Sequence, residues 1–208
     1  MMEQQIGRGW RRVFSHPLVY ESFQRATGAR SLRKTLARQY LRPKPGDRVL
    51  DVGCGPAHLL EFLPDVHYVG VDLSPAYIEH ANRAFRGRGK FLVADVTSFE
   101  MHDLEPFDLV TAVGLLHHLS DEGVAQLLAR LGARMSGPKG RLVTIDGCYI
   151  AGQSRIAAFL LSLDRGRHVR TPEEYALLAK PVFSKVRVTV RHDLLRIPFT
   201  FCILELSL

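Results

Sequence analysis

The sequence predicts an α/β fold with a mostly parallel sheet that is covered by helices on both faces. Short apolar runs of strand length alternate with segments that have helical spacing, and several of these runs end in Asp or Gly. Strands and helices that alternate in this way form right-handed βαβ units. The chain has 208 residues, of which 46% are hydrophobic, which suffices for one domain with a buried core and an added lid.

The most informative stretch is RVLDVGCGP, at Arg48–Pro56. An apolar strand runs directly into a turn that contains Gly53 and Gly55. Glycines can adopt the backbone angles that such a turn needs, and without a Cβ atom they let a ligand approach the main chain. We expect Pro56 to open a helix over Ala57–Leu63, whose first N–H groups face that ligand.

Side chains in this turn bear on the identity of the ligand. Asp51 would repel a nearby phosphate, so a cationic or hydroxyl-bearing ligand is favoured, and Cys54 lies within the same turn. The dinucleotide fingerprint GxGxxG requires a third glycine where this chain has His58. NAD is therefore the second candidate, and glycines that merely shape a turn are the third interpretation.

The second strand, His67–Val71, ends at Asp72, about twenty residues after Asp51. At this separation an acidic side chain at the tip of the neighbouring strand reaches the two hydroxyls of a ribose. Ser74 then precedes a helix over Ala76–Phe85.

The following strands also end in candidate ligand-binding residues. Phe91–Ala94 ends at Asp95, Asp108–Val113 ends at Gly114, and the fifth strand is Arg141–Asp146. A helix from Ser120 to about Met135 separates the last two. Ligands of open α/β sheets bind along the carboxyl edge of the strands, where these residues are expected to meet.

The basic charge is concentrated at the N-terminal end of the chain. Residues 1–48 hold eleven Lys and Arg against three Asp and Glu, a net charge of +8, whereas residues 49–208 hold seventeen against eighteen. We expect a short segment near Pro17–Ala26 and an amphipathic helix over Ser31–Leu41. The charged face of that helix is either simply solvated or meets an anionic substrate, a nucleic acid or a membrane surface.

Composition bears on the state of the cysteines and on the cellular location of the protein. The three cysteines lie far apart without zinc-ligand spacing, so free thiols and no metal site are expected. No apolar run approaches the roughly 20 residues of a membrane-spanning helix, and the first residues are not those of a signal peptide. These features predict a cytoplasmic protein.

In order and spacing, these motifs resemble those of class I S-adenosylmethionine-dependent methyltransferases of the small, single-domain type (methyltransferase type 11/25-like). The resemblance covers about residues 45–146 and is carried by VLDVGCGP, YVGVDLS, FLVADV, FDLVTAVGLLHHL and GRLVTID. It implies S-adenosyl-L-methionine as cofactor. It also implies a three-layer, Rossmann-like sheet of seven strands, in which Ser184–Val190 and Phe199–Leu206 supply an antiparallel C-terminal part.

The resemblance assigns roles to individual residues. Gly53 and Gly55 line the methionine moiety, Asp72 holds the ribose hydroxyls, Asp95 and Val96 contact the adenine, and Gly114 to Leu116 close the sulfonium side. The full set of expected cofactor-binding residues is Asp51, Gly53, Cys54, Gly55, Asp72, Leu73, Asp95, Val96, Gly114 and Leu115.

We expect one methyltransferase domain over residues 1–208. It consists of an N-terminal helical arm (1–45), a cofactor-binding core (46–146), a substrate lid (147–181) and C-terminal strands (182–208). The lid carries a helix near Ser154–Leu163 and a second helix from Pro172. In relatives of this type, such an insertion and the N-terminal helices cover the substrate pocket.

A hydroxyl acceptor benefits from a base, and an imidazole can take its proton near neutral pH. His117 is the favoured candidate because it lies nearer to Gly114 than its neighbour His118 does. That both histidines only pack or cap remains an alternative.

The acceptor is expected to be a small molecule, and our hypothesis is an anionic one, such as a nucleotide-linked sugar or a natural-product intermediate. Arginine side chains bind carboxylate or phosphate in two-point fashion, and the lid sequence LDRGRHVR is rich in them. The candidate substrate residues are Tyr20, Tyr149, Arg165 and Arg170. An RNA or protein methyltransferase and a non-catalytic cofactor-binding protein are the alternatives, although GLLH replaces the NPPY-type tetrapeptide of many base-amine methyltransferases.

Overall fold

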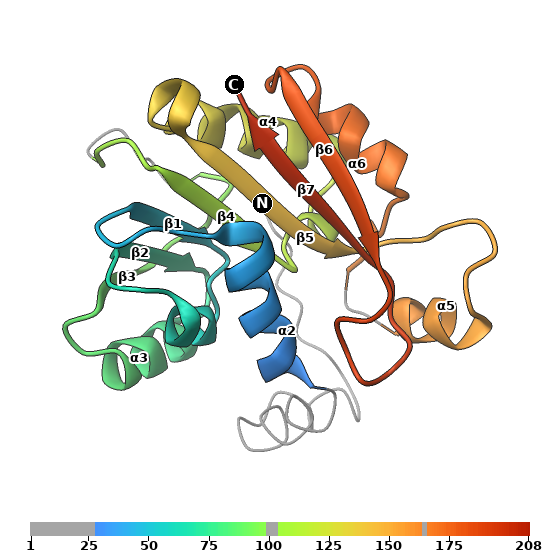
Figure 1. Cartoon of the computed structure of the whole chain (residues 1–208), viewed down its shortest axis with the longest axis horizontal. Helices are drawn as coiled ribbons and strands as arrows, with labels where there is room; N and C mark the ends of the chain where they lie inside the picture. Colours follow the sequence, from blue (N-terminus) through green and yellow to red (C-terminus); the bar gives the residue numbers. More distant parts are fainter. Residues whose placement is uncertain (1–27, 99–103, 164–165) are drawn as a thin grey trace.

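A computed structural model describes residues 28–98, 104–163 and 166–208. Seven strands form one sheet in the order β3-β2-β1-β4-β5-β7-β6, which confirms the predicted seven-stranded α/β fold (Figure 1). The first five strands are parallel, and β7 pairs antiparallel with both β5 and β6. The strands are β1 Arg48–Val52, β2 His67–Asp72, β3 Gly89–Val93, β4 Leu109–Val113, β5 Arg141–Gly147, β6 Lys185–Arg191 and β7 Phe201–Ser207.

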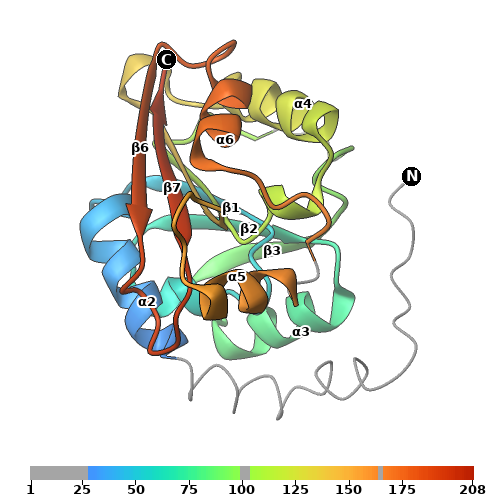
Figure 2. The same cartoon turned by 90° about the vertical axis from the view of Figure 1, so that its right-hand side faces the viewer.

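Helices cover both faces of the sheet (Figure 2). One core packs α4 and α6 against one face, and the other packs α2, the turn that follows it, and α3 against the opposite face. The α-helices are α2 Ala29–Leu36, α3 Pro75–Ala84, α4 Asp121–Gly132, α5 Arg155–Ser162 and α6 Pro172–Ala179. The shorter helical turns are η2 Ala37–Leu41, η3 His58–Phe62, η4 Leu116–His118 and η5 Gly137–Lys139.

The starts of the helices follow the local sequence. The side chain of Ser74 accepts a hydrogen bond from the Tyr77 N–H at the start of α3, and Ser120 does the same for Gly123 at the start of α4. At α6, Thr171 and Glu174 form a reciprocal capping box.

The prediction of a helix over Ala57–Leu63 is wrong. The segment forms only the short 3₁₀ turn η3, and Ala57 precedes it with a left-handed backbone (φ 57°). Pro64 forces Leu63 into an extended conformation that ends the turn. The connection from β1 to β2 therefore holds a 3₁₀ turn in place of an α-helix.

The amphipathic helix expected over Ser31–Leu41 is present as α2 continued by η2, a single π-helical turn. Its apolar face, which includes Leu32, Leu36 and Tyr40, is buried. The segment expected near Pro17–Ala26 lies outside the described residues.

Candidate active site

The residues expected to bind a cofactor gather at one edge of the sheet. Because β1 to β5 are parallel, their carboxyl ends share that edge. In chain order these ends bring Gly53, Asp72, Asp95, Gly114 and Asp146 to the same side of the molecule.

The turn after β1 is tied to its two neighbouring strands. Gly53 and Gly55 have positive φ angles of 73° and 54°, which side chains disfavour. The N–H groups of Gly53 and Cys54 both donate to the carbonyl of Val71 on β2, at 2.8 and 3.1 Å. On the other side, a Cβ atom at Gly53 would lie 3.2 Å from a methyl group of Leu115, just after β4. At Gly53 both the backbone angle and the space therefore favour glycine, whereas at Gly55 only the backbone angle does.

Asp72 is held in place by main-chain groups. Its Oδ2 accepts from the Gly55 N–H and its Oδ1 from the Ser74 N–H, each at 2.8 Å. A carboxylate has about four acceptor positions, so two remain for a ligand's hydroxyl groups. Beside it, Leu73 is an apolar side chain that is 51% exposed, an arrangement that suits a flat apolar ring.

Asp95 has a similar local arrangement one strand further. Its Oδ1 accepts hydrogen bonds from both the N–H and the hydroxyl of Thr97. The side chain of the adjacent Val96 is buried in the core on the α4 side. Any contact between Val96 and a ligand at this edge would therefore come from its main chain.

Buried polar groups lie beneath the turn after β1. Asp51 is 2% exposed and accepts a hydrogen bond from the Tyr68 hydroxyl at 2.5 Å. Burial, opposed by this hydrogen bond and reinforced by the charge of Asp72, raises the pKa of Asp51 to about 7. Burial likewise raises the pKa of Cys54 far above its usual range, so this residue is an unreactive thiol.

His117 forms a buried pair with Asp146. Its Nδ1 lies 2.7 Å from Oδ1 of Asp146, and its main-chain N–H donates to the same oxygen at 3.2 Å. A carboxylate can only accept, so Nδ1 carries the proton and Nε2 is the basic nitrogen of the ring. The second oxygen of Asp146, Oδ2, is buried and has no hydrogen-bond partner among the residues that the structure describes. Buried oxygens of this kind are uncommon and call for an explanation, such as a catalytic role or a bound water, and the hydroxyl of Thr111 is a second example.

The segment expected to form the lid lies directly on His117. The N–H of His168 donates to the His117 carbonyl at 3.0 Å. A Cβ atom added to Gly166 would lie 2.8 Å from Cγ of the imidazole, so only glycine fits against this ring. The ring centroids of His117 and His118 lie 4.1 Å apart, but His118 is exposed.

Arg170 does not have the role expected from the sequence. It is only 6% exposed, and its guanidinium donates to the carbonyls of Leu116, Leu119 and His168 and to the carboxylate of Asp121. These partners occupy the guanidinium, so the expectation that it binds an anionic substrate is corrected. Arg170 instead fastens the lid to the loop that carries His117.

The other expected substrate residues are less constrained. Tyr149 is half-buried just after β5, and its N–H donates to the carbonyl of Arg170. Tyr20 and Arg165 lie outside the described residues. Within the described residues no group of three or more possible ligands could hold a metal ion.

Sequence reasoning missed Asp146 as the partner of His117. Its position at the end of the fifth strand was visible, but the pairing joins residues 29 positions apart. The available signal was the rule that the carboxyl ends of adjacent parallel strands meet.

Known proteins resemble both the sequence and the fold. A family model described as "Methyltransferase domain" matches residues 49–140. The 27-O-demethylrifamycin SV methyltransferase of Amycolatopsis mediterranei is 36% identical over 123 residues, which cover 55% of this chain and 44% of that protein. The human "Probable tRNA methyltransferase 9B" is 33% identical over 108 residues, covering 51% of this chain and 23% of that protein.

Among solved structures, the mitomycin 7-O-methyltransferase MmcR matches with a TM-score of 0.69 and 22% identity, over 96% of this chain and 60% of that one. This likeness shows the fold. The chain spans less than half the length of the curated relatives named above. In the part of the chain that the structure describes, no helix is long and apolar enough to cross a membrane.

Proposed function

The chain belongs to the class I S-adenosylmethionine-dependent methyltransferases, and we propose that it transfers the cofactor's methyl group to a hydroxyl oxygen of a small-molecule acceptor. The observation that carries this proposal is the buried His117–Asp146 pair at the carboxyl ends of β4 and β5. A hydroxyl must lose its proton as it is methylated, and this pair supplies a base next to the strand ends that bind the cofactor.

In this proposal the cofactor binds at the same edge of the sheet, along the carboxyl ends of the parallel strands. The turn at Gly53 and Gly55 receives the methionine part, Asp72 accepts hydrogen bonds from the ribose hydroxyls, and Leu73 flanks the adenine. Asp72 fits this role because two main-chain N–H groups already fix its orientation. When bound, S-adenosylmethionine supplies a methyl group on a positively charged sulfur, ready for in-line attack.

The residues then perform the proton transfer. Nε2 of His117 takes the acceptor's proton as the oxygen–methyl bond forms and the sulfur–methyl bond breaks. The resulting imidazolium is stabilised by Asp146, which also keeps the ring in the tautomer that leaves Nε2 basic.

The relatives support the class of acceptor only in part. The rifamycin relative is by name a small-molecule methyltransferase and the human relative a probable tRNA methyltransferase. We place the small molecule first because the rifamycin relative is matched over 44% of its own length, against 23% for the tRNA relative. Arg170 is already bound by carbonyl and carboxylate groups of the protein. The hypothesis of an anionic acceptor therefore rests on Arg165.

The test measures transfer of a labelled methyl group to a panel of alcohols and phenols, with bulk tRNA and protein as separate arms. His117→Gln and Asp146→Asn should each lower kcat by about 10²-fold or more while the affinity for S-adenosylhomocysteine stays within a few fold. The matched control is His118→Gln, the exposed neighbour. Transfer to tRNA or protein alone, or full activity of His117→Gln, would refute the proposal.

A further inference from the structure

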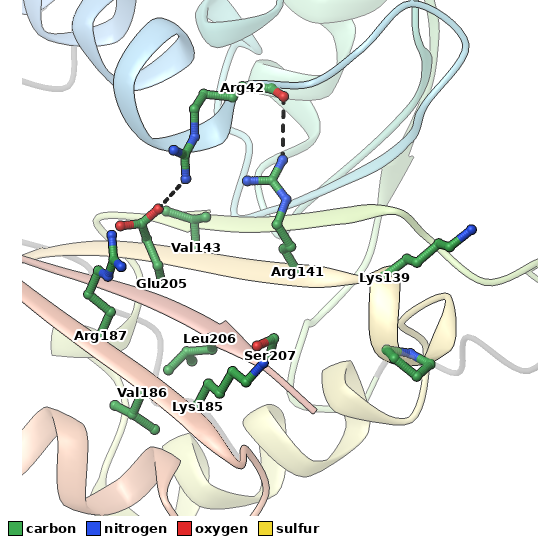
Figure 3. A pocket seen from close by; sticks show the side chains of 11 residues that line it. Arg42, Lys139, Arg141, Val143, Lys185, Val186, Arg187, Glu205, Leu206 and Ser207 are labelled. Atoms are coloured by element: carbon green, nitrogen blue, oxygen red, sulfur yellow. Dashed lines mark hydrogen bonds and ion pairs between the residues drawn. The ribbon is translucent and has the colours of Figure 1, made fainter.

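A basic groove lies at the end of the sheet where the parallel strands begin. The candidate active site lies at the opposite end, where those strands finish. The volume of the groove is about 700 Å³, and it is formed at the start of β5, the start of β6 and the end of β7, beside the residue that follows η2. Figure 3 shows the side chains that line it. The cations among them are Arg42, Lys139, Arg141, Lys185 and Arg187, whereas Glu205 is the one carboxylate.

The register of the strands places these side chains on one face. Arg187 lies opposite Glu205, and Lys185 lies opposite Ser207 on the neighbouring strand. Because side chains alternate between the faces of a sheet, Lys185 and Arg187 point to the same side. Their positive charges therefore form a row along an edge strand.

Two of the arginines are fixed before any ligand arrives. The guanidinium of Arg141 donates to the main-chain carbonyls of Tyr40, Leu41 and Arg42, the shortest at 2.5 Å. Arg42 forms an ion pair with Glu205 (Figure 3). Burial and the neighbouring charge of Arg42 lower the pKa of Arg141, as expected where positive charge is crowded.

The other three cations have no carboxylate of their own in the described lining, where Glu205 lies opposite Arg187 but forms its ion pair with Arg42. In the described part of the chain, Lys139, Lys185 and Arg187 form no ion pair and no side-chain hydrogen bond. Clustered like charges repel, so an arrangement of this kind costs stability unless an anion binds there. A group with several negative charges in a small volume, such as a polyphosphate, matches this charge best.

The size and the lining of the groove favour a small ligand over a long one. Its volume falls within the range of about 300–1,000 Å³ that is typical of small-molecule sites. Its lining has no aromatic side chain on which a nucleic-acid base could stack. Both features favour a compact ligand that is recognised through its phosphates.

We propose that this groove is a second ligand site, which binds a small molecule that carries two or more linked phosphate groups. The site is separate from the methyl-transfer site, because β5 has Arg141 at its start and Asp146 near its end. The proposal does not depend on the acceptor or on the role of His117.

The test uses inorganic tripolyphosphate as the probe and calorimetry as the measurement. The cofactor site is first saturated with S-adenosylhomocysteine, so that the probe reports on the groove. We expect saturable binding at about 50 mM salt that weakens as the salt concentration rises. Lys185→Gln combined with Arg187→Gln should lower the affinity about tenfold or more.

The matched control removes two exposed cations from the other end of the sheet, Arg86→Gln with Lys90→Gln. It has the same net charge as the groove variant and should bind tripolyphosphate within about twofold of the parent. Absence of saturable binding, or an equal loss in both variants, would overturn the proposal. An RNA of about twelve nucleotides that binds far more tightly than tripolyphosphate, and loses affinity in the groove variant, would also overturn it, in favour of a nucleic-acid surface.

Discussion

At the residue scale, Asp51 combines an acidic side chain with almost complete burial. Its pKa is raised to about 7, so the folded protein holds a proton on it that the unfolded chain, with a pKa of about 3.8, releases. Between these two values the folded state binds more protons than the unfolded state. The contribution of Asp51 to stability therefore falls as the pH rises from about 4 to about 7.

This fall in stability with rising pH leads to the first prediction, which concerns Asp51→Asn. The uncharged amide still accepts a hydrogen bond from Tyr68 but cannot titrate, so the variant should lack this part of the pH dependence. Relative to the parent, its free energy of unfolding should gain roughly 2–4 kcal/mol between pH 4 and pH 7. Urea unfolding at several pH values measures this difference, with Asp65→Asn as an exposed control. A constant difference between parent and Asp51→Asn would show that Asp51 does not titrate in this range.

The second prediction concerns Gly166, which packs on the His117 ring. In Gly166→Ala the new methyl group would meet Cγ of His117 at 2.8 Å and its carbonyl oxygen at 2.9 Å. The main-chain oxygen cannot move aside as a flexible side chain can, so the lid must shift. We expect kcat/KM for the acceptor to fall about tenfold or more while cofactor affinity is kept.

Steady-state kinetics and calorimetry on the same preparation separate these two effects. Gly123→Ala is the control, because a methyl group there meets its nearest neighbour at an ordinary 3.4 Å. Unchanged kinetics in Gly166→Ala would mean that the lid does not need to lie on His117.

At the scale of elements, Arg170 links the lid to the loop between β4 and α4. Its guanidinium donates to Leu116 and Leu119, the residues on either side of the two histidines. It also lies over the ring of Tyr175 on α6, whose hydroxyl donates to the Gly147 carbonyl at the end of β5. One buried cation thus holds together the segments that surround His117.

The third prediction follows from this arrangement. Arg170→Met leaves several buried carbonyl groups without donors, so stability should fall by roughly 3 kcal/mol. Arg170→Lys should recover part of that loss, because an ammonium group can satisfy some of the same acceptors. Asp121→Asn is the control: this carboxylate is 77% exposed, and its change should cost less than about 1 kcal/mol. Urea unfolding compares the three variants, and equal losses in Arg170→Met and Asp121→Asn would contradict the account.

Local pattern was sufficient to predict most elements but not the contacts between distant segments. The strand β4 and the Ser120 start of α4 depend on apolar runs and a capping side chain, which adjacent residues reveal. The helix predicted after Pro56 failed because a positive φ at Ala57 is set by the fold and not by that residue's own preference. Arg170 was misread for a related reason: the carbonyls that bind it lie about fifty residues away.

At the scale of the molecule, the proposed cofactor site is assembled from several parallel strands that are neighbours only when the sheet is formed. Asp72 of β2 binds the turn after β1, and that turn contacts Leu115 after β4. The unfolded chain holds none of these groups together. A ligand of this site therefore binds the folded state alone and stabilises the whole sheet.

The fourth prediction measures this linkage. S-adenosylhomocysteine at about 100 times its Kd should add about 2.7 kcal/mol to the stability of the folded protein. For a chain of this length that corresponds to an increase in Tm of roughly 5–10 °C.

Asp72→Ala removes the acceptor for the ribose hydroxyls, and a loss of about 2 kcal/mol in binding would abolish most of the increase at the same ligand concentration. His117→Gln should retain the full increase, because in the proposed mechanism the imidazole acts on the acceptor and not on the cofactor. Asp65→Ala, an exposed change before β2, should retain it as well. A melting curve of Asp72→Ala that shifts as far as that of the parent would remove Asp72 from the site, whereas a lost shift in His117→Gln would place this histidine in cofactor binding.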